Sequence, residues 1–235
     1  MHVAPIAVYF FKRPLAYAPA LAAMEQWVSA RLENRVGDAL FFLEHTPVIT
    51  LGMRGRAEHI RISDADLQTF GMDRVSTSRG GEVTLHAPGQ LILYPILQLS
   101  GQTASAGDHV RHLEEIGIRT AADFGLAAFR RRGLPGIWTD QGKLGALGVR
   151  FRRWVSFHGL SLNVDLDLKL FDLIVPCGLA HEPVTSFRAL LGDSSPSLAT
   201  VRMRTMEHCE KIFGRPCIPQ SLGDTWPPPA GDPVT

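Results

Sequence analysis

Residues 91–99, with the sequence LILYPILQL, constrain the fold of this 235-residue chain more than any other segment, because nearly all of them are apolar. A strand without a polar face cannot lie against solvent, so we expect it at the centre of a sheet that is covered on both sides. Three long segments with helical spacing of apolar residues, 17–32, 107–124 and 197–213, can provide that cover. The segment therefore predicts a layered protein built around one buried strand.

Shorter segments with the composition of strands or short helices fill the rest of the chain. β-Branched, aromatic or alternating residues predict strands at 6–11, 39–44, 48–51, 73–76, 127–131, 136–139, 143–151, 155–157 and 160–164. The pair His158-Gly159 is expected to interrupt the extended run between the last two. Short helices are expected at 63–70 (capped by Ser63), 168–174 and 182–190. Because strands and helices do not alternate regularly, the predicted fold class is α+β.

The length and composition are those of one globular domain. A chain of this size can build one substantial core and shows no linker to a second, so we expect a single domain over residues 1–213. Residues 214–235 are rich in proline and glycine and are expected to form a disordered tail. The net charge of +1 gives no reason to expect nucleic acid or an anionic membrane as a partner. Arginine runs at 130–132 and 150–153 are either docking surfaces or solvated faces.

The sequence gives no sign of export or of membrane insertion. The N-terminal segment has the pattern of a strand rather than of a signal peptide. No stretch reaches the roughly 18 unbroken apolar residues of a membrane-spanning helix. The three cysteines, Cys177, Cys209 and Cys217, are an odd number without metal-ligand spacing. We therefore expect a reducing, cytoplasmic setting, with Cys209 and Cys217 as structural residues.

Residues 142–179 contain the best candidates for covalent chemistry. Cys177 lies between Pro176 and Gly178, on a constrained turn whose backbone N–H groups could face an oxyanion. A cysteine needs thiolate character to attack a carbonyl, and a neighbouring cation such as Lys143 would supply it by lowering the thiol pKa. The alternatives are that Cys177 is a small buried hydrophobe and that Lys143 is an edge lysine reaching to water. The pattern alone leaves both open.

Residues 79–90, RGGEVTLHAPGQ, are the second informative segment. Paired glycines allow the backbone to approach a ligand closely, and Arg79 and His86 could bind a carbonyl or carboxylate oxygen. The alternative is a tight β-hairpin in which the glycines serve only the turn. His158 is either a wall of a ligand pocket or a core histidine. The spacing of the other histidines predicts no metal site.

Several segments, taken together, resemble the lipoyl(octanoyl) transferases. They are RGGEVTLHAPGQ at 79–90, GKLGALGVRFRRWVSFHGLSLNV at 142–164 and VPCGLAHEPVTS at 175–186, with HTPVITLGMRGRAEHI at 45–60 as the upstream segment. They occur in the order of the family and span residues 42–190. The resemblance implies the fold of the lipoate and biotin protein ligases, with a mixed, largely antiparallel sheet flanked by helices.

The resemblance also implies a reaction and its residues. Such enzymes take an octanoyl group from acyl carrier protein onto a cysteine, here Cys177, paired with Lys143. They then pass it to a lysine of lipoyl domains, in the E2 subunits of 2-oxoacid dehydrogenases and in the glycine cleavage H protein. No ATP, cofactor or metal is required, and we expect a monomer. The implied acyl-binding residues are Arg79, Gly80, Gly81, Glu82, Val83, Thr84, Leu85, His86, Ala146, Leu147, Gly148, Gly159, Leu160 and Ser161, to which we add His158.

Three other functions stay open from the sequence. They are an ATP-dependent lipoate ligase on the same fold, a cysteine thioesterase in which water replaces the acceptor lysine, and a binding module without turnover. The chain departs from the family at Ala87, where glycine is usual. A methyl group there would strain the loop only if its backbone were left-handed.

Overall fold

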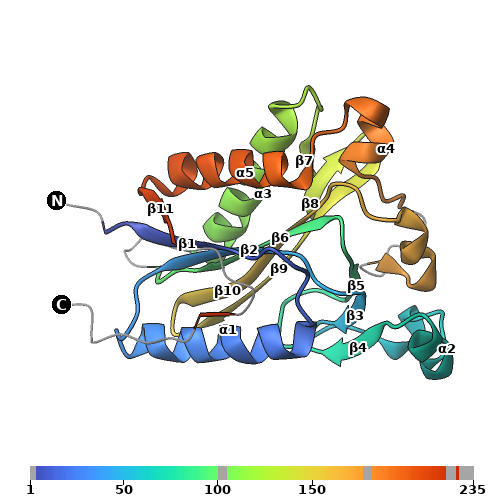
Figure 1. The fold of residues 1–235 in the computed structure, drawn as a ribbon, viewed down its shortest axis with the longest axis horizontal. Helices are drawn as coiled ribbons and strands as arrows, with labels where there is room; N and C mark the ends of the chain where they lie inside the picture. Colours follow the sequence, from blue (N-terminus) through green and yellow to red (C-terminus); the bar gives the residue numbers. More distant parts are fainter. Residues whose placement is uncertain (1–3, 100–104, 177–181, 221–225, 228–235) are drawn as a thin grey trace.

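The computed structural model describes residues 4–99, 105–176, 182–220 and 226–227, and its strands form two sheets (Figure 1). The larger sheet has eight strands in the order β11-β1-β2-β6-β10-β9-β8-β7. Among these strands the pairs β1–β2 and β1–β11 are parallel and the others antiparallel. The strands are β1 (Ile6–Phe10), β2 (Ala39–Leu43), β6 (Gln90–Ile96), β7 (Phe129–Arg131), β8 (Leu134–Thr139), β9 (Gly142–Arg152), β10 (Val155–Asn163) and β11 (Cys217–Pro219).

The apolar run of the sequence forms the centre of this sheet. Strand β6 pairs with β2 on one side and with β10 on the other, and all of its residues are buried. A strand with neighbours on both edges and cover on both faces loses contact with water, which is why it carries apolar side chains throughout. The predicted central strand and the predicted α+β class with a mixed, largely antiparallel sheet are confirmed.

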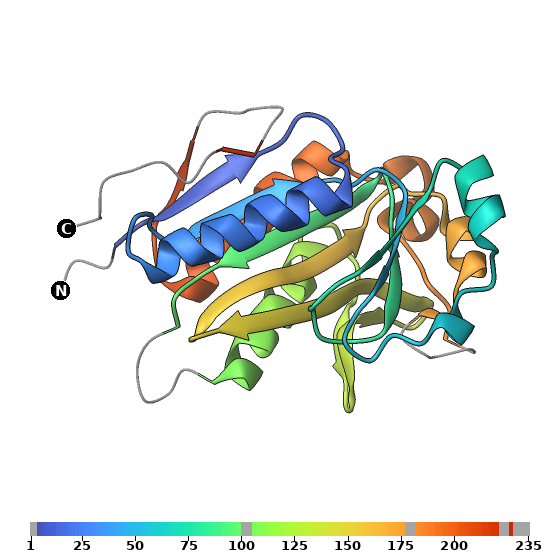
Figure 2. The same ribbon diagram turned by 90° about the horizontal axis from the view of Figure 1, so that it is seen from below.

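Helices cover both faces of the larger sheet (Figures 1 and 2). On one face Met24 and Trp27 of α1 pack against β2 and β6, and on the other Leu113 of α3 and Val201 of α5 enter a second core cluster. None of the described helices is both long and apolar enough to cross a membrane. The helices are α1 (Tyr17–Leu32), α2 (Asp64–Thr69), α3 (Ala106–Ala122), α4 (Phe187–Leu191) and α5 (Leu198–Phe213), with 3-10 turns η1 (Ala57–His59), η2 (Leu168–Leu173) and η4 (Gly192–Ser194).

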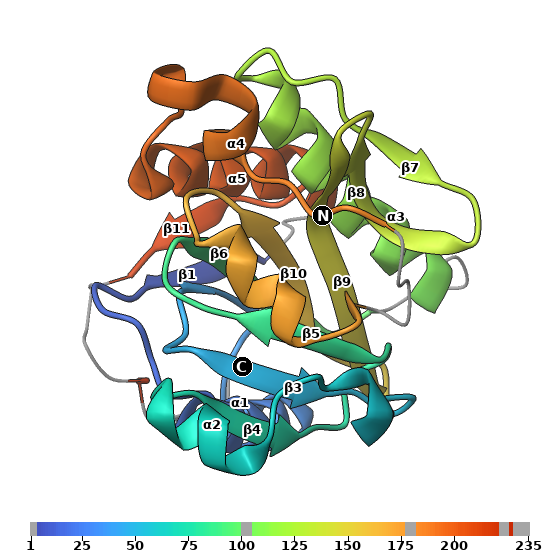
Figure 3. The ribbon, with the colours of Figure 1, turned by 90° about the vertical axis from the view of Figure 1, so that its right-hand side faces the viewer.

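The smaller sheet lies beside the α1 face of the larger one (Figure 3). It consists of β4 (Asp73–Ser76), β3 (Val48–Leu51) and β5 (Val83–His86), in that order. Its core contains Leu67 from α2 and Phe171 from η2. Strand β5 pairs antiparallel with β3, which is distant in sequence. The alternative of a local hairpin over residues 79–90 is therefore wrong.

Three local expectations need correction. Strand β10 continues through His158 instead of breaking there, although His158 has a left-handed backbone with φ of 57°. Residues 217–219 form β11 beside β1, where we expected an irregular tail, because the open edge of β1 can pair with them. Helix α4 begins only at Phe187, since the backbone of residues 183 and 185 is hydrogen-bonded to Lys143.

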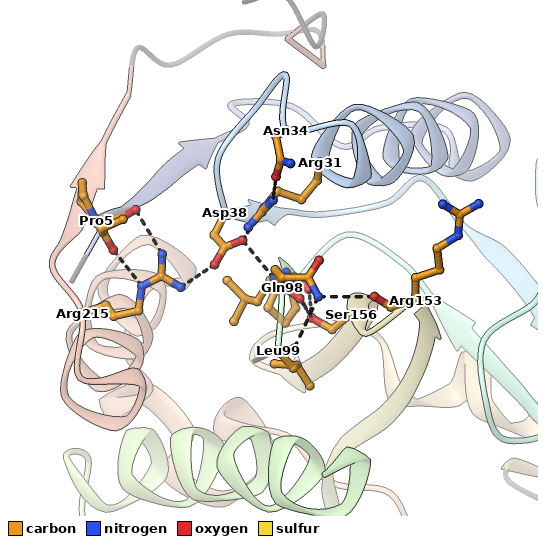
Figure 4. A network of polar contacts seen from close by, with 12 residues as sticks. Pro5, Arg31, Asn34, Asp38, Gln98, Leu99, Arg153, Ser156 and Arg215 are labelled. Atoms are coloured by element: carbon orange, nitrogen blue, oxygen red, sulfur yellow. Dashed lines mark hydrogen bonds and ion pairs between the residues drawn. The ribbon is translucent and has the colours of Figure 1, made fainter. Parts of the chain in front are cut away.

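A buried carboxylate ties the N-terminal and C-terminal segments to the sheet (Figure 4). Asp38 precedes β2 and accepts hydrogen bonds from Arg31 at the end of α1 (2.7 Å), from the backbone N–H of Gln98 (3.0 Å) and from Arg215 beyond α5. Its side chain is only 5% exposed. A carboxylate so placed needs all of these partners, because an unpaired buried charge is costly.

We predict that Asp38→Asn lowers the free energy of unfolding by roughly 3 kcal/mol, because it leaves two arginines without their buried counter-charge. Chemical denaturation of both proteins measures the difference. The matched control is Glu33→Gln, which removes an exposed ion pair with Arg35 and should change stability by less than about 1 kcal/mol. Equal effects of the two substitutions would show that the Asp38 network does not stabilise the fold.

Candidate active site

A narrow cavity lies over the α1 face of the larger sheet, roofed by the loop before β5. Its volume is about 40 Å³, and since roughly 10–15 Å³ of such space holds one water, it admits only a slender group. A groove of about 350 Å³ adjoins it and shares Gly81, Glu82, Leu147 and Gly148 with its wall. The cavity is lined by Tyr17, Arg79, Gly81, Glu82, Thr84, His86, Ile92, Tyr94, Ala146, Leu147, Gly148, His158, Gly159, Leu160 and Ser161.

Small residues form the floor of the cavity. On β9 and β10, Gly148 is paired with Gly159, and Ala146 with Ser161. A side chain on Gly148 would place its Cβ 2.8 Å from the carbonyl oxygen of Gly80 in the roof. Glycine is therefore needed at residue 148 for the roof to approach the sheet this closely.

Arg79 holds the roof in place. Its guanidinium donates hydrogen bonds to the carbonyl oxygens of Thr50 (2.8 Å), Glu82 (2.7 Å) and Gly80 (3.0 Å). The backbone N–H of Gly80 in turn donates to the carbonyl of Val149 on β9 (3.0 Å). Arg79 thus links the smaller sheet, the glycine loop and the larger sheet, while its buried positive charge borders the cavity.

Neutral imidazole and phenol rings form the inner end. His45 is hydrogen-bonded through Nδ1 to the carbonyl of Leu15 (2.9 Å), so Nε2 accepts from the hydroxyl of Tyr94 (2.8 Å). His86 lies within reach of Gln90 Oε1 (2.7 Å) and stacks on Tyr17 with ring centroids 5.9 Å apart. Burial lowers the pKa of His45 to about 4 and, together with the nearby His45, the pKa of His86 to about 3. Both rings are therefore uncharged at neutral pH.

Lys143 lies in the adjoining groove. It is only 8% exposed, and β9 is an interior strand between β8 and β10. The alternative of an edge lysine reaching to water is therefore wrong. Its ammonium lies 5.2 Å from the centroid of the Trp138 ring, at a distance where the ring face attracts a cation.

Cys177 lies outside the described residues, but both flanks of its segment are anchored. Before it, the backbone N–H of Val175 donates to the carbonyl of His59 (2.7 Å). After it, Lys143 donates its backbone N–H to Pro183 (2.8 Å) and accepts one from Thr185 (3.0 Å). This contact requires glycine at residue 142, whose φ is 129° and whose Cβ would lie 2.5 Å from the carbonyl oxygen of Pro183. Residues 183–185, a few positions after Cys177 in the sequence, thus run directly beside Lys143.

The structure brings most of the predicted binding residues to the cavity. Gly80 lies in the groove instead, while Val83 and Leu85 alternate away from the cavity into the core of the smaller sheet. The cavity is also lined by Tyr17, Ile92 and Tyr94, which were not expected from the sequence. The only sequence signal for Ile92 and Tyr94 is their two-residue spacing, which places both on the same face of β6.

The remaining candidate positions are structural. Ala87 is buried and is not among the described non-glycine residues with positive φ, so its methyl group causes no strain there. Cys209 and Cys217 are free thiols in the core. Burial raises the pKa of Cys209 well above its usual range and that of Cys217 to about 11, which makes both poor nucleophiles at neutral pH.

Comparisons with known proteins identify the family of this chain. The model of the family described as lipoyl protein ligase A/B catalytic domain matches residues 16–210. Octanoyltransferases of Chloroflexus aurantiacus and Solibacter usitatus are 45% and 43% identical to the chain over 202 and 203 residues. These matches cover 85% and 86% of the chain and 90% and 91% of the relatives.

Solved structures with a similar fold are lipoate protein ligases. A bipartite lipoate protein ligase of Thermoplasma acidophilum superposes with a TM-score of 0.71 at 14% identity, covering 94% of this chain and 89% of that one. Lipoate-protein ligase A bound with ATP gives a TM-score of 0.68 at 15% identity, covering 91% and 90%. At these identities the likeness shows the fold alone.

Four buried histidines have lowered pKa values, so we expect the protein to lose stability in acid. They are His45, His86, His109 and His158. Their folded pKa values are below the usual 6.5, so the unfolded chain takes up protons first, and stability is complete above pH 6.5 and is lost as the pH falls toward 4. Each such histidine costs up to about 1.4 kcal/mol per pH unit in that window. Urea unfolding between pH 7 and pH 5 measures the slope.

The slope of the unfolding free energy against pH is proportional to the number of protons that the chain takes up on unfolding. The variant His86→Gln should lower that number by close to one. The control is Gln68→Ala, which changes an exposed residue without removing a titratable group and should leave the slope as it is. A slope unaffected by His86→Gln would contradict the assignment of a neutral, buried His86.

Proposed function

The chain belongs to the lipoyl protein ligase A/B catalytic family and is an acyltransferase like its octanoyltransferase relatives, and from that premise we propose that it transfers an octanoyl group from acyl carrier protein to a lysine of a lipoyl domain. The transfer passes through a thioester on Cys177. One observation carries the proposal: buried Lys143 lines the groove that adjoins the cavity, and its backbone is hydrogen-bonded to residues 183 and 185, a few positions after Cys177.

The cavity and the groove bind different parts of the acyl group. The cavity is too small for the whole chain, so it takes the distal carbons, and the proximal carbons and the carbonyl lie in the groove with Lys143. Each buried methylene contributes about 0.8 kcal/mol. A slot this narrow favours an unbranched chain over any ring or branched acid.

Lys143 promotes the first half-reaction through its charge and the second as a proton acceptor. In the first, its ammonium stabilises the Cys177 thiolate, whose sulfur attacks the carbonyl carbon of the donor thioester. The bond from that carbon to the donor sulfur breaks, and the released thiolate takes a proton from the Lys143 ammonium, which leaves Lys143 neutral. In the second, the neutral acceptor amine attacks the Cys177 thioester and the cysteine leaves as a thiolate. The neutral Lys143 accepts or relays the proton of the amine, which restores the ammonium beside the thiolate.

We further propose the setting of this reaction. The donor thioester is already activated, so the transfer uses no ATP, cofactor or metal. The acceptors are the lipoyl domains of E2 subunits of 2-oxoacid dehydrogenases and the glycine cleavage H protein. The free thiols of Cys209 and Cys217 support a cytoplasmic location. The large exposed apolar side chains come from separate segments, which supports a monomer: Met53, Phe70, Phe129, Trp154, Met203 and Ile218.

Incubation with octanoyl-acyl carrier protein is expected to add one octanoyl group to the protein, on Cys177, as read by intact mass and peptide mapping. Cys177→Ser should lose lipoyl-domain octanoylation, and Cys209→Ser should keep it. A Cys177→Ser variant with the wild-type rate would overturn the proposal. Three other results would each favour a different function. Lipoylation that requires ATP and free lipoate would favour a ligase, and release of free octanoate while acceptor is present would favour a thioesterase. Formation of a complex without turnover would favour a binding module.

Lys143→Ala is expected to slow acylation of Cys177 about tenfold or more at pH 7, because the thiol loses the cation that favours its thiolate. The difference in acylation rate between Lys143→Ala and the wild type should become smaller toward pH 9, where a free thiol ionises without a neighbouring cation. Single-turnover rates across this range give the comparison. Lys211→Ala, an exposed lysine on α5, is the matched control and should match the wild type. A pH-independent loss in Lys143→Ala would argue against the thiolate role.

A further inference from the structure

His158 lies at the inner end of the cavity. The cavity and the groove that holds Lys143 share four wall residues, and His158 is not one of them. Its ring lies edge-on to Tyr94 of β6, with ring centroids 6.1 Å apart. The cavity thus runs from the groove beside β9 across β10 toward β6, and His158 and Tyr94 stand where it stops.

An unusual backbone brings the imidazole to this place. In a regular strand His158 would share a face with Leu160 and Leu162, which belong to the core beneath α3 and α5. With φ of 57° its ring instead stacks on Phe157, of the α1-side core, at 5.1 Å. Its backbone N–H is directed at Met24 Sδ of α1 (3.4 Å). A left-handed backbone is unfavourable for a residue with a side chain, so the position is maintained against a conformational cost.

The ring has no polar role in the fold. His158 is 1% exposed, and neither ring nitrogen has a hydrogen-bond partner among the residues that the structure describes. His45 and His86, by contrast, are each hydrogen-bonded to protein atoms. Burial, with Arg79 nearby, lowers the pKa of His158 to about 3, so the ring is neutral. A buried polar group that is both strained and unpaired calls for a reason other than stability.

We infer that His158 is the end wall of the acyl cavity and sets the length of the acyl chain that the enzyme accepts. The inference rests on the proposed acyl transfer. The bulk of the imidazole stops the chain, and Met24 and Phe157 lie behind it. Removing the ring would extend the cavity into the space between these two side chains and Tyr94.

The test compares octanoyl and decanoyl donors with the wild type and His158→Gly. Glycine adopts positive φ readily, so this variant relieves the strained backbone and should fold. The ratio of kcat/KM for decanoyl over octanoyl should rise about tenfold or more, as expected for burying two further methylenes. His158→Asn, which tolerates the same backbone, should give an intermediate ratio.

The matched control is His109→Ala. His109 is another buried imidazole, but it packs against Phe151 and Phe213 and does not line the cavity. The ratio of kcat/KM for decanoyl over octanoyl in His109→Ala should equal that of the wild type. An unchanged ratio in His158→Gly, with octanoyl transfer intact in the wild type, would overturn the end-wall role alone. Absence of transfer from every donor in the wild type would instead overturn the proposed function.

Discussion

The guanidinium of Arg79 is the contact on which the cavity depends. It binds the carbonyl oxygens of Thr50 and Glu82, which belong to the smaller sheet and to its entry loop. The neighbouring Gly80 then bonds to Val149 of the larger sheet. Hydrogen bonds from a charged donor are stronger than neutral ones, and burial strengthens them further. One side chain thus fixes the distance between floor and roof, and the glycine at residue 148 keeps that distance small.

The distribution of charge in the site depends on the close contact between the Arg79 loop and the larger sheet. Around the cavity, burial keeps the imidazoles of His45, His86 and His158 neutral. The positive charges that border the cavity and the groove in the described residues are Arg79, Lys143 and Arg54. An apolar chain can enter beside neutral rings without displacing a charge. A thiolate or an oxyanion would find its stabilising cation at the mouth, where the proposed chemistry takes place. In the proposed reaction the two ends of the site would therefore serve different steps, recognition of the acyl chain and reaction of its carbonyl.

Much of the fold could be predicted because its signals are local. The apolar run that became β6 and the helical spacing of α1 needed no tertiary information. The exceptions depend on contacts between distant segments: β11 forms because β1 offers an edge, and α4 starts late because Lys143 binds the backbone before it. For the site, the glycine loop and Lys143 were readable as motifs. Tyr94 was hidden inside an apolar strand, and the orientation of His158 depends on a backbone angle that no pattern of residues reveals.

We propose that one acyl chain, attached to Cys177, lies beside Lys143 and beneath the Arg79 loop. A crystal structure of the octanoylated enzyme measures this most directly. We expect density for the acyl chain that begins in the groove at Lys143, passes over Gly148 and ends against His158. Density for an octanoyl chain on Cys177 that lies outside this cavity, with the Arg79 loop still closed on the sheet, would contradict it.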